Sequence, residues 1–511
     1  MKEPTRSAAS PVWPLPDLLA HAGVEPLGET APPRVSISSL TCDSREVHPG
    51  SCFVAVCGTE SDGHRYVQAA LEAGAVAIVA DREKSLPASA AILRFHDTRE
   101  TLAKLAAAYY GLRGDGAKPL RLVGITGTNG KTTVAWLLRS ILRAAGHRPA
   151  LLGTIEYDLL AQQCKAPLTT PGPVDLCRHL ATARDAGADT AVLEVSSHAL
   201  DQRRTDGLEF NVGVFTNLSG DHLDYHGTMD AYWQAKRRLF DALGADAVTV
   251  VNYDDPVGEL MASNLAARVL SFATESPQAD VTARVDRVDL SGSRFLLKGP
   301  SFELQTRCAL VGRHNVMNVL AAAGAAHALG VTPEAILGAV ESFEGVPGRL
   351  QRVEPEDCPF SVLVDYAHTD DALNHALRAV RPMTTGRLVC VFGCGGDRDR
   401  SKRPRMAAVV GKIADAAYVT SDNSRTEDPQ EIIDDILPGF GSDFRCRVVV
   451  RVDRKEAIEL ALADARAGDT IVIAGKGHET YQLVGDKVLS FDDVTAARNC
   501  LRIAQIKEDV A

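Results

Sequence analysis

Residues 121–133 read RLVGITGTNGKTT, and this stretch decides the fold class. The apolar run RLVGIT predicts a short buried strand, the glycines after it predict a tight turn, and residues 132–145 have the periodicity of an amphipathic helix. A strand that enters a helix through a glycine-rich turn is typical of a phosphate-binding loop, because backbone N–H groups and the helix N-terminus then face an anion. The stretch therefore predicts a parallel α/β sheet with a nucleotide site at the end of this strand.

The loop also carries the side chains that polyphosphate chemistry needs. Lys131 can reach the β- and γ-phosphates, and the Thr132 hydroxyl can ligate Mg²⁺. The match to G-x-x-x-x-G-K-[ST] is imperfect, because position 125, where the first glycine belongs, is isoleucine. Strand, turn, Lys-Thr pair and helix nevertheless coincide, which predicts binding of ATP or a similar nucleotide. The predicted ATP-binding residues of the loop are Gly127, Thr128, Asn129, Gly130, Lys131, Thr132 and Thr133.

The 511 residues divide into blocks that differ in their pattern of apolar and polar residues. We predict three domains, at residues 1–117, 118–346 and 347–511, in an α/β fold. Apolar strands such as TAVLEVSS and VGVFTNL alternate with helical segments in the second block, which predicts a central parallel-sheet ATPase domain. Residues 267–306 alternate with period two and predict a half-exposed β-subdomain. The third block has the same alternation, from SVLVDYAH to DTIVIAGKG, and predicts a Rossmann-like α/β domain.

Composition excludes several classes of protein. Hydrophobic residues make up 45% and charged residues 24%, as in ordinary globular proteins. The 55 Lys and Arg against 66 Asp and Glu leave a net charge of −11, which argues against broad nucleic-acid binding. No run approaches the about 18 apolar residues of a membrane span, so we expect no membrane insertion. The 11 cysteines form no C-x-x-C pair, which favours reduced thiols and a cytoplasmic location.

Further motifs follow the loop in order along almost the whole chain. They are EVSSHALDQRR, NLSGDHLDYHGTMDAYWQAK, GRHNVMN, VDYAHTDDAL, FGCGGDRDRSKRP, SDNSRTEDP and AGKGHE. Together with TGTNGKTT, this set resembles the Mur ligase superfamily, which also includes folylpolyglutamate synthetases, and is most similar to its tripeptide-forming branch. The resemblance implies an ATP-dependent acid–amino-acid ligase of peptidoglycan precursor synthesis. It implies that meso-diaminopimelate is added to the D-Glu carboxylate of UDP-N-acetylmuramoyl-L-Ala-D-Glu through an acyl phosphate.

The resemblance also implies how the site handles charge. The substrate carboxylate and the γ-phosphate are both anions, so cations must screen their approach. Glu194, with Thr132 and the phosphates, is implied to hold one Mg²⁺, and His222 a second. Lys236 is implied to be carbamylated by CO₂, since an ammonium would repel Mg²⁺ whereas a carbamate oxygen can ligate it. The implied catalytic residues are Lys131, Lys236, Glu194 and His222.

Substrate contacts outside the loop come from the same resemblance. The residues implied to hold the UDP-linked peptide are Ser44, Thr169, Thr170, Ser196, Gln202 and Arg204. Asn315 and Asp365 are implied to contact the nucleotide. On this interpretation, residues 1–117 bind the UDP-substrate, residues 118–346 bind ATP and residues 347–511 bind the incoming amino acid.

The identity of that amino acid depends on SDNSRTEDP. In the family, Asp-Asn-Pro-Arg marks addition of meso-diaminopimelate, which differs from lysine by one distal carboxylate that a guanidinium can bind bidentately. Arg425 supplies that guanidinium here, although Ser424 replaces the proline and removes a fixed φ. The residues implied to bind the amino acid are Arg398, Asp422, Asn423, Ser424, Arg425, Gly475 and Glu479.

Three alternatives stay open. A lysine-adding ligase is the nearest, and a folylpolyglutamate synthetase shares TGTNGKT and the acyl-phosphate chemistry. A protein that hydrolyses ATP to switch a partner's affinity is a different class, which would release ADP without forming an amide. The preferred interpretation predicts a monomer whose partners are small-molecule substrates.

Overall fold

The computed structural model describes residues 11–28, 31–58, 61–81, 84–86, 91–114, 119–355, 358–441 and 444–510, with side chains to residue 502. Residues 115–118, where we predicted the first domain boundary, lie outside the described residues. The chain divides into two compact units. Residues 1–272 with 321–336 form the first, and residues 273–320 with 337–511 form the second. The three predicted domains remain a prediction.

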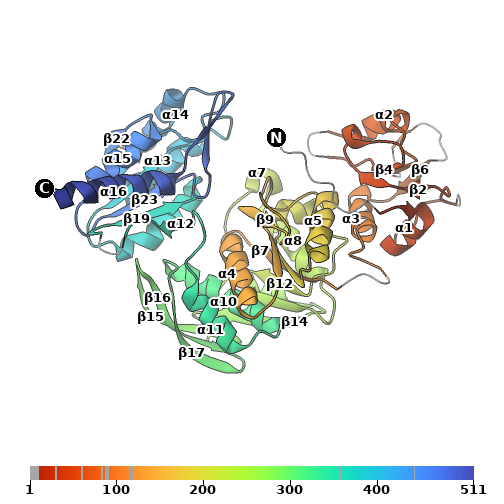
Figure 1. The fold of residues 1–511 in the computed structure, drawn as a ribbon, viewed down its shortest axis with the longest axis horizontal. Coiled ribbons are helices and arrows are strands. Elements are labelled where there is room, and N and C mark those ends of the chain that lie inside the picture. Colours follow the sequence, from red (N-terminus) through yellow and green to blue (C-terminus); the bar gives the residue numbers. More distant parts are fainter. Residues whose placement is uncertain are drawn as a thin grey trace. The chain divides into compact units, whose positions relative to one another are not determined.

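A parallel sheet forms the centre of the first unit (Figure 1), with the strand order β8-β11-β7-β12-β13-β14. These strands are β7 (Arg121–Thr126), β8 (Pro149–Leu152), β11 (Thr190–Glu194), β12 (Val212–Phe215), β13 (Val248–Asn252) and β14 (Arg268–Ala273). The short antiparallel strands β9 (Glu156–Asp158) and β10 (Gln163–Lys165) extend the edge at β8. Strand β7 is central, so the loop that follows it lies beside the carboxyl ends of β11 and β12, where α/β sheets bind ligands.

Helices of the first unit include the predicted one after the glycine-rich turn. It is α4 (Lys131–Ala144), and its buried face carries leucine and isoleucine at helical spacing. Two other helices that matter below are α5 (Pro173–Asp185) and α8 (Met229–Asp241). The strand–turn–helix prediction is therefore confirmed.

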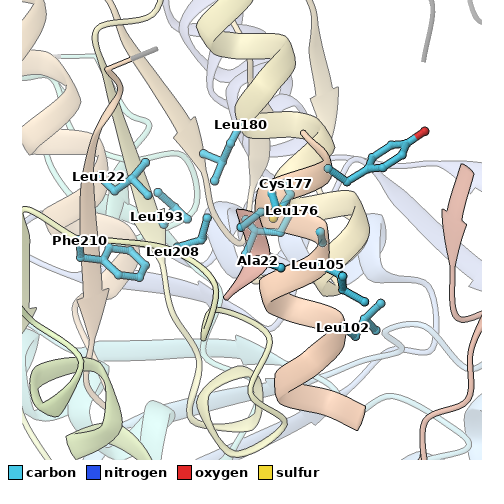
Figure 2. Close-up of a cluster of buried hydrophobic side chains, with 14 of the residues drawn as sticks. Ala22, Leu102, Leu105, Leu122, Leu176, Cys177, Leu180, Leu193, Leu208 and Phe210 are labelled. Carbon is cyan, nitrogen blue, oxygen red and sulfur yellow. The ribbon is translucent and has the colours of Figure 1, made fainter. Parts of the chain in front are cut away.

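The N-terminal part of the first unit is a smaller parallel sheet, in the order β3-β4-β5-β6. Its strands are β3 (Ser39–Thr41), β4 (Ser51–Val54), β5 (Ala77–Asp81) and β6 (Ile92–Phe95). Helix α3 (Thr98–Tyr109) packs on α5, and buried leucines from α3, α5, β7 and β11 meet in one core (Figure 2). Burial of this apolar surface stabilises the association of the two sheets.

The second unit contains an antiparallel meander and a second parallel sheet. The meander is β15 (Val281–Asp289), β16 (Gly292–Gly299) and β17 (Phe302–Cys308), whose alternating burial confirms a half-exposed β-subdomain there. The predicted subdomain began too early, at residue 267. The segment up to Ala273 belongs instead to β14, which is buried at residues 270–273 and pairs in parallel with β13.

The second parallel sheet has the strand order β18-β19-β23-β20-β21-β22, with only β18 antiparallel. Its strands are β18 (Gln351–Arg352), β19 (Ser361–Asp365), β20 (Leu388–Phe392), β21 (Ala416–Val419), β22 (Arg447–Val450) and β23 (Thr470–Ala474). Apolar residues fill two cores, one on each face of this sheet. The covering helices are α12 (Asp370–Val380), α13 (Lys402–Ile413), α14 (Pro429–Ile436), α15 (Arg454–Ala463) and α16 (Asp493–Val510). This doubly covered sheet confirms the predicted Rossmann-like α/β architecture.

A hairpin of β24 (Tyr481–Val484) and β25 (Lys487–Ser490) follows the last parallel strand. Within the described ranges, no helix has the length and apolar character needed to cross a membrane.

Candidate active site

The turn after β7 is shaped to receive phosphate. Gly127 has φ +147°, and a Cβ there would lie 1.9 Å from the Thr216 Oγ1, so only glycine fits. Gly130, with φ +88°, is the N-cap of α4 and leaves the first N–H groups of the helix directed into the turn. The Lys131 Nζ donates to the carbonyl oxygens of Gly127 and Thr128, at 2.8 Å each. The lysine thus lies over the loop that a polyphosphate would occupy.

A buried carboxylate lies beside this loop. Glu194, at the carboxyl end of β11, is 1% exposed. Its Oε2 accepts hydrogen bonds from the Thr132 Oγ1 at 2.8 Å and the Thr154 Oγ1 at 2.9 Å, and its Oε1 accepts from the Thr154 N–H at 2.8 Å. Hydroxyl and carboxylate oxygens are the hard ligands that Mg²⁺ takes. The pair of Thr132 and Glu194 therefore fits a magnesium ion that also binds phosphate.

Lys236, from α8, is buried against the same loop. Its side chain is 1% exposed, and its Nζ donates to the Gly127 carbonyl oxygen at 2.8 Å. The Nζ also lies 4.4 Å from the ring centroid of Tyr232, whose hydroxyl is 3.1 Å from the Thr128 Oγ1. Burial, reinforced by the charge of Lys131, lowers the pKa of Lys236 well below its usual range. Lys236 consequently differs from the exposed Arg238 two residues further along the helix.

His222 lies at the start of the short helix α7 (Leu223–His226). It has φ +54°, in the left-handed region, and its side chain is 47% exposed. Burial of part of the ring lowers the pKa of His222, which favours the neutral form that ligates metals. In the part of the chain that the structure describes, no three His, Cys, Asp or Glu side chains are grouped to hold a metal. A Mg²⁺ ion here would take most of its ligands from phosphate and water.

The predicted contacts to the UDP-linked peptide connect to the same strand end. The Thr170 Oγ1 donates to the Glu194 carbonyl oxygen at 2.8 Å and accepts from the Ser196 N–H at 3.0 Å. The Arg204 Nη1 donates to the Thr170 carbonyl oxygen at 2.6 Å, and its Nη2 donates to the Gln202 Oε1 at 2.7 Å. These four residues therefore form one hydrogen-bonded group at Glu194.

Two further predicted contacts, Thr169 and Ser44, also belong to the first unit. The Thr169 Oγ1 is 3.1 Å from the Thr154 Oγ1, which joins it to the carboxylate of Glu194. Ser44 begins a short 3₁₀-helix (Ser44–Glu46) after β3, in the smaller N-terminal sheet.

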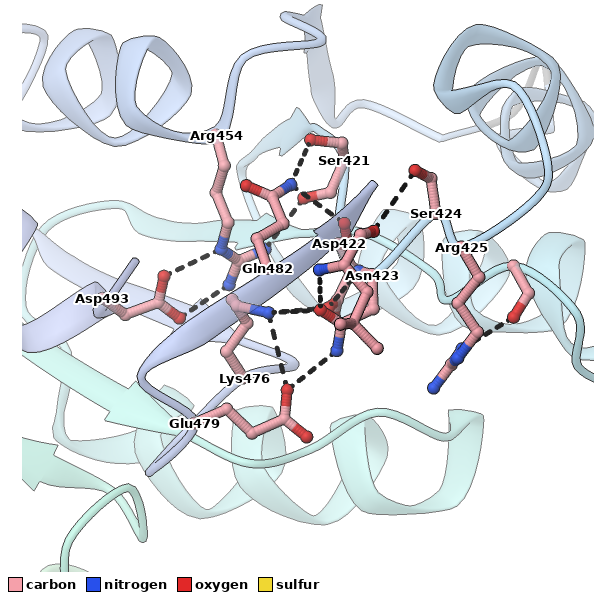
Figure 3. Close-up of polar contacts among 12 residues, drawn as sticks. Ser421, Asp422, Asn423, Ser424, Arg425, Arg454, Lys476, Glu479, Gln482 and Asp493 are labelled. Atoms are coloured by element: carbon pink, nitrogen blue, oxygen red, sulfur yellow. Dashed lines mark hydrogen bonds and ion pairs between the residues drawn. The ribbon is translucent and has the colours of Figure 1, made fainter. Parts of the chain in front are cut away.

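A second polar group lies in the second unit, at the carboxyl ends of β21 and β23 (Figure 3). The Lys476 Nζ is fully buried and lies 3.2 Å from the Asp422 Oδ1, 3.1 Å from the Asn423 Oδ1 and 3.5 Å from the Glu479 Oε2. The Asn423 Nδ2 donates to the same Glu479 oxygen at 2.9 Å. Although burial opposes ionisation, the nearby cations Lys476 and Arg454 lower the pKa of Asp422. The Asp422 carboxylate thus stays charged beside this buried lysine.

Arg425 is held in an uncommon backbone conformation beside this group. It has φ +51°, and its Nη1 donates to the Gly396 carbonyl oxygen at 2.7 Å. Its backbone N–H donates to the Leu483 carbonyl oxygen at 3.1 Å, which attaches the loop to the hairpin. Arg398, which was also predicted to bind the amino acid, is exposed, and its Nη1 donates to the Asp397 carbonyl oxygen at 3.2 Å.

Gly475 contributes space rather than a side-chain contact. It has φ +115°, and a Cβ there would lie 2.8 Å from the Asp422 Oδ2. Ser424 is 1% exposed. The structure therefore brings residues 422–425, Gly475 and Glu479 together at one strand edge.

Comparison with known proteins assigns the family. Three family models match consecutive segments: the Mur ligase family catalytic domain at residues 36–110, the Mur ligase middle domain at 125–326, and the Mur ligase glutamate ligase domain at 348–477. A relative from Geobacter metallireducens is 45% identical over 479 residues, which cover 90% of this chain and 93% of the relative. The chain belongs to the Mur ligase family.

Individual Mur ligases agree with this assignment. The relative from Geobacter metallireducens is named UDP-N-acetylmuramoyl-L-alanyl-D-glutamate--2,6-diaminopimelate ligase. A relative from Syntrophomonas wolfei has the same name and is 44% identical, covering 91% of this chain and 95% of its own length. The solved structure of a ligase with that name superimposes with a TM-score of 0.70 at 34% identity, over 96% of this chain and 99% of the other. The predicted family and α/β fold class are both confirmed.

Two residues that the Mur ligase resemblance assigned to the nucleotide have structural contacts of their own. Asn315 lies in the first turn of α10 (Arg313–Ala328), and its Nδ2 donates to the Val311 carbonyl oxygen, before the helix, at 2.8 Å. The Asp365 carboxylate accepts from the Leu350 N–H at 2.7 Å and from the Ala367 N–H at 2.8 Å, and burial raises its pKa. A role of either residue in ATP binding stays a prediction.

The sequence reasoning missed residues that the folded Mur ligase chain places at the site. Lys476 stands inside the quoted motif AGKGHE, and a lysine flanked by two glycines after a buried strand was the signal. Thr154 and Gly153 had no such signal, because they follow β8 and reach Glu194 only through strand pairing.

Gly153 yields a prediction that tests the position of this carboxylate. A Cβ at Gly153 would lie 2.2 Å from the Glu194 Oε1, so Gly153→Ala must displace the carboxylate. We expect ligation to fall about 100-fold, as for a misplaced reacting group, with little change in melting temperature. Steady-state kinetics and thermal unfolding measure both. Gly244→Ala, where a Cβ meets nothing within 4 Å, is the control, and equal activity of the two variants would contradict the prediction.

Proposed function

We propose that this Mur ligase joins meso-diaminopimelate to the D-Glu carboxylate of UDP-N-acetylmuramoyl-L-Ala-D-Glu, with ATP, in peptidoglycan precursor synthesis. Relatives that match 90% of its length carry this activity in their names. The observation that carries the choice of amine is the group at residues 422–425, where Arg425 lies two residues after Asn423, which bonds to Glu479 at 2.9 Å. The guanidinium of Arg425 matches the distal carboxylate of diaminopimelate, and the acidic side chain of Glu479 matches its distal ammonium.

The chemistry takes two steps. An oxygen of the D-Glu carboxylate attacks the γ-phosphorus of ATP, and the bond to ADP breaks. The amine nitrogen of diaminopimelate then attacks the carbonyl carbon of the acyl phosphate and loses a proton, and inorganic phosphate leaves. Because carboxylate, ATP and phosphate are all anions, the first step is limited by charge repulsion unless cations lie around the transferring phosphoryl group.

Residues of the first unit would supply that screening. Lys131 directs its ammonium over the loop, and the N–H groups at the start of α4 face the phosphates. Thr132 and Glu194 would hold one Mg²⁺, and His222 a second. A bound Mg²⁺ neutralises phosphate charge and polarises the phosphoryl oxygens.

Carbamylation of Lys236 is part of this proposal. Only a neutral amine adds to CO₂, forming an N–C bond and releasing a proton. The burial of Lys236 beside the Gly127 carbonyl oxygen supports this, because an ammonium in such a place is disfavoured. The resulting carbamate would present anionic oxygens next to the phosphate-binding loop.

Substrate binding is assigned to three domains. Residues 1–117, with Ser44, would hold the UDP moiety, and residues 118–346 would hold ATP, with Asn315 and with Asp365 from the third domain as further nucleotide contacts. Residues 347–511 would hold the amino acid. The group formed by Thr170, Ser196, Gln202 and Arg204, together with Thr169, would place the peptide carboxylate at the end of β11. We propose a cytoplasmic location, since the reaction consumes ATP and a UDP-linked precursor. We also propose that the protein is a monomer.

A ligation assay with a panel of amines tests this function. Purified protein is supplied with ATP, Mg²⁺ and the muramoyl dipeptide, together with meso-diaminopimelate, L-lysine or no amine. A separate reaction contains ATP, Mg²⁺, folate and glutamate. We expect amide product and equimolar ADP with diaminopimelate, a much lower kcat/KM with lysine, and no product without an amine. Product with lysine alone would identify a lysine-adding ligase, ADP without amide would indicate an ATPase switch, and product from folate and glutamate would identify a folylpolyglutamate synthetase.

Arg425→Ala provides the residue-level test of amine choice. Loss of a charge-assisted hydrogen bond should cost roughly 1.5–3 kcal/mol, which is about 10- to 150-fold in kcat/KM for diaminopimelate. The KM for ATP should not change. Arg398→Ala, at an exposed arginine of the same site, should cost less. An equal loss of activity toward diaminopimelate and lysine would mean that Arg425 is structural.

A further inference from the structure

Arg403 is a fully buried arginine that the proposed reaction does not use. It lies near the start of α13 and is 0% exposed. Its Nη2 lies 2.7 Å from the Glu427 Oε1 and its Nη1 3.0 Å from the Glu427 Oε2, a bidentate pair. Its Nη1 also donates to the Asp435 Oδ2 at 2.8 Å. A bidentate pair of this kind fixes geometry as well as charge.

Glu427, held by Arg403, also bonds to the loop that follows β20. Its Oε1 also accepts from the Asp397 N–H at 2.6 Å. The Asp397 carboxylate in turn accepts from the Thr426 N–H at 3.2 Å and from the Thr426 Oγ1 at 2.7 Å. Asp397 therefore links the loop at residues 395–398 to residues 422–427 through both its backbone N–H and its carboxylate. Its own backbone has φ +52°.

Arg425 depends on the same contacts. Gly396, whose carbonyl oxygen accepts from the Arg425 Nη1 at 2.7 Å, donates its N–H to the Asn423 carbonyl oxygen at 2.9 Å. A Cβ at Gly396 would lie 2.0 Å from the Ser424 carbonyl oxygen, so the two loops are in direct contact. Since Ser424 provides no fixed φ, the conformation of Arg425 at φ +51° relies on these tertiary contacts.

We infer that Arg403 is a positioning residue that, through Glu427 and the loop at Asp397, holds the Arg425 guanidinium in place for the distal carboxylate of the incoming amino acid. The Arg403–Glu427 pair therefore determines selectivity for a substrate that carries this carboxylate over one that lacks it. This inference rests on the proposed function and extends it from the contacting arginine to the pair that supports it. A small displacement of a binding group can reduce activity by a large factor, so the residues that hold it in place affect substrate choice.

Glu427→Gln is the first test, because it keeps the shape of the side chain and removes its charge. We expect the KM for diaminopimelate to rise about 10-fold, with selectivity over lysine falling in proportion, while the KM for ATP and kcat at saturation change less than about 2-fold. Arg403→Lys, which keeps the charge but loses the bidentate geometry, should behave alike. If either variant fails to fold, Thr426→Val removes one hydrogen bond of the same network and carries the same expectation.

Asp469→Asn is the matched control. Asp469 is 3% exposed on its side chain and pairs with the Arg387 Nη2 at 2.6 Å, at the amino-terminal edge of the same sheet. The Asp469→Asn substitution should lower the melting temperature without changing the KM for diaminopimelate relative to that for ATP. If Glu427→Gln gave the pattern of Asp469→Asn, Arg403 would be merely structural and the inference would be overturned.

A double-mutant cycle tests whether the pair acts through Arg425. In the Arg425→Ala background, we expect Glu427→Gln to change the KM for diaminopimelate by less than about 2-fold, since the effects of substitutions at coupled residues do not add. A full effect in both backgrounds would refute the inference while leaving the proposed function intact. Failure of the unmodified protein to ligate diaminopimelate would instead refute the proposed function.

Discussion

Lys236→Arg is expected to reduce ligation at least about 1,000-fold, the upper range for removal of one stabilising group. An arginine stays protonated at every accessible pH and cannot react with CO₂, so it would put a fixed cation where the proposed carbamate ligates Mg²⁺. The lysine is 1% exposed, and burial lowers its pKa well below the usual range, so the neutral amine is accessible. Steady-state kinetics at saturating ATP measure the effect.

Lys236→Met separates this effect from misfolding. The methionine fills similar volume without a buried charge, and the Gly127 carbonyl oxygen keeps the Lys131 Nζ as a donor at 2.8 Å. We expect a melting temperature at or above that of the unmodified protein, with ligation still lost. Activity of Lys236→Arg close to that of the unmodified protein would remove the carbamate from the mechanism. A gain in mass of the native protein on addition of bicarbonate, absent in Lys236→Met, would support it directly.

Glu194→Gln is expected to lower kcat about 100- to 1,000-fold through loss of the charge that we propose holds Mg²⁺. The amide can still accept from the Thr154 N–H, which now lies 2.8 Å from the Glu194 Oε1, and donate to the hydroxyl groups of Thr132 and Thr154. The fold should therefore persist while the requirement for Mg²⁺ rises. A titration of activity against Mg²⁺ measures this shift.

Glu156→Gln is the control for the loss of a carboxylate charge nearby. Glu156 pairs with the Arg139 Nη1 at 2.7 Å, and its side chain is 14% exposed. We expect it to change stability by a modest amount and to leave the Mg²⁺ titration unaltered. If Glu194→Gln gave an unchanged titration as well, Glu194 would not be a metal ligand, and its role would be to hold Thr154.

The phosphate-binding loop and the sheet around it were predictable because their signals are local. A run of apolar residues, a turn that needs glycine and a helical apolar period lie next to one another in residues 121–145, and the structure has β7 and α4 there. The strand ends that carry Glu194 and residues 422–425 could be recognised in the same way. The start of the meander was misplaced, because residues 271–273 alternate as a half-exposed strand would, but pair with β13 in the buried sheet.

The sequence by itself determined the family, the α/β class and the residue types gathered at each strand end, since these follow from local pattern and from motif order. Only the tertiary structure decided which side chains meet. It placed Gly153 against Glu194, buried Lys476 between Asp422 and Glu479, and joined Arg403 to the loop of Arg425. Apart from that between Lys476 and Glu479, these contacts join residues that are far apart along the chain. They depend on strand order and register, which no local propensity specifies.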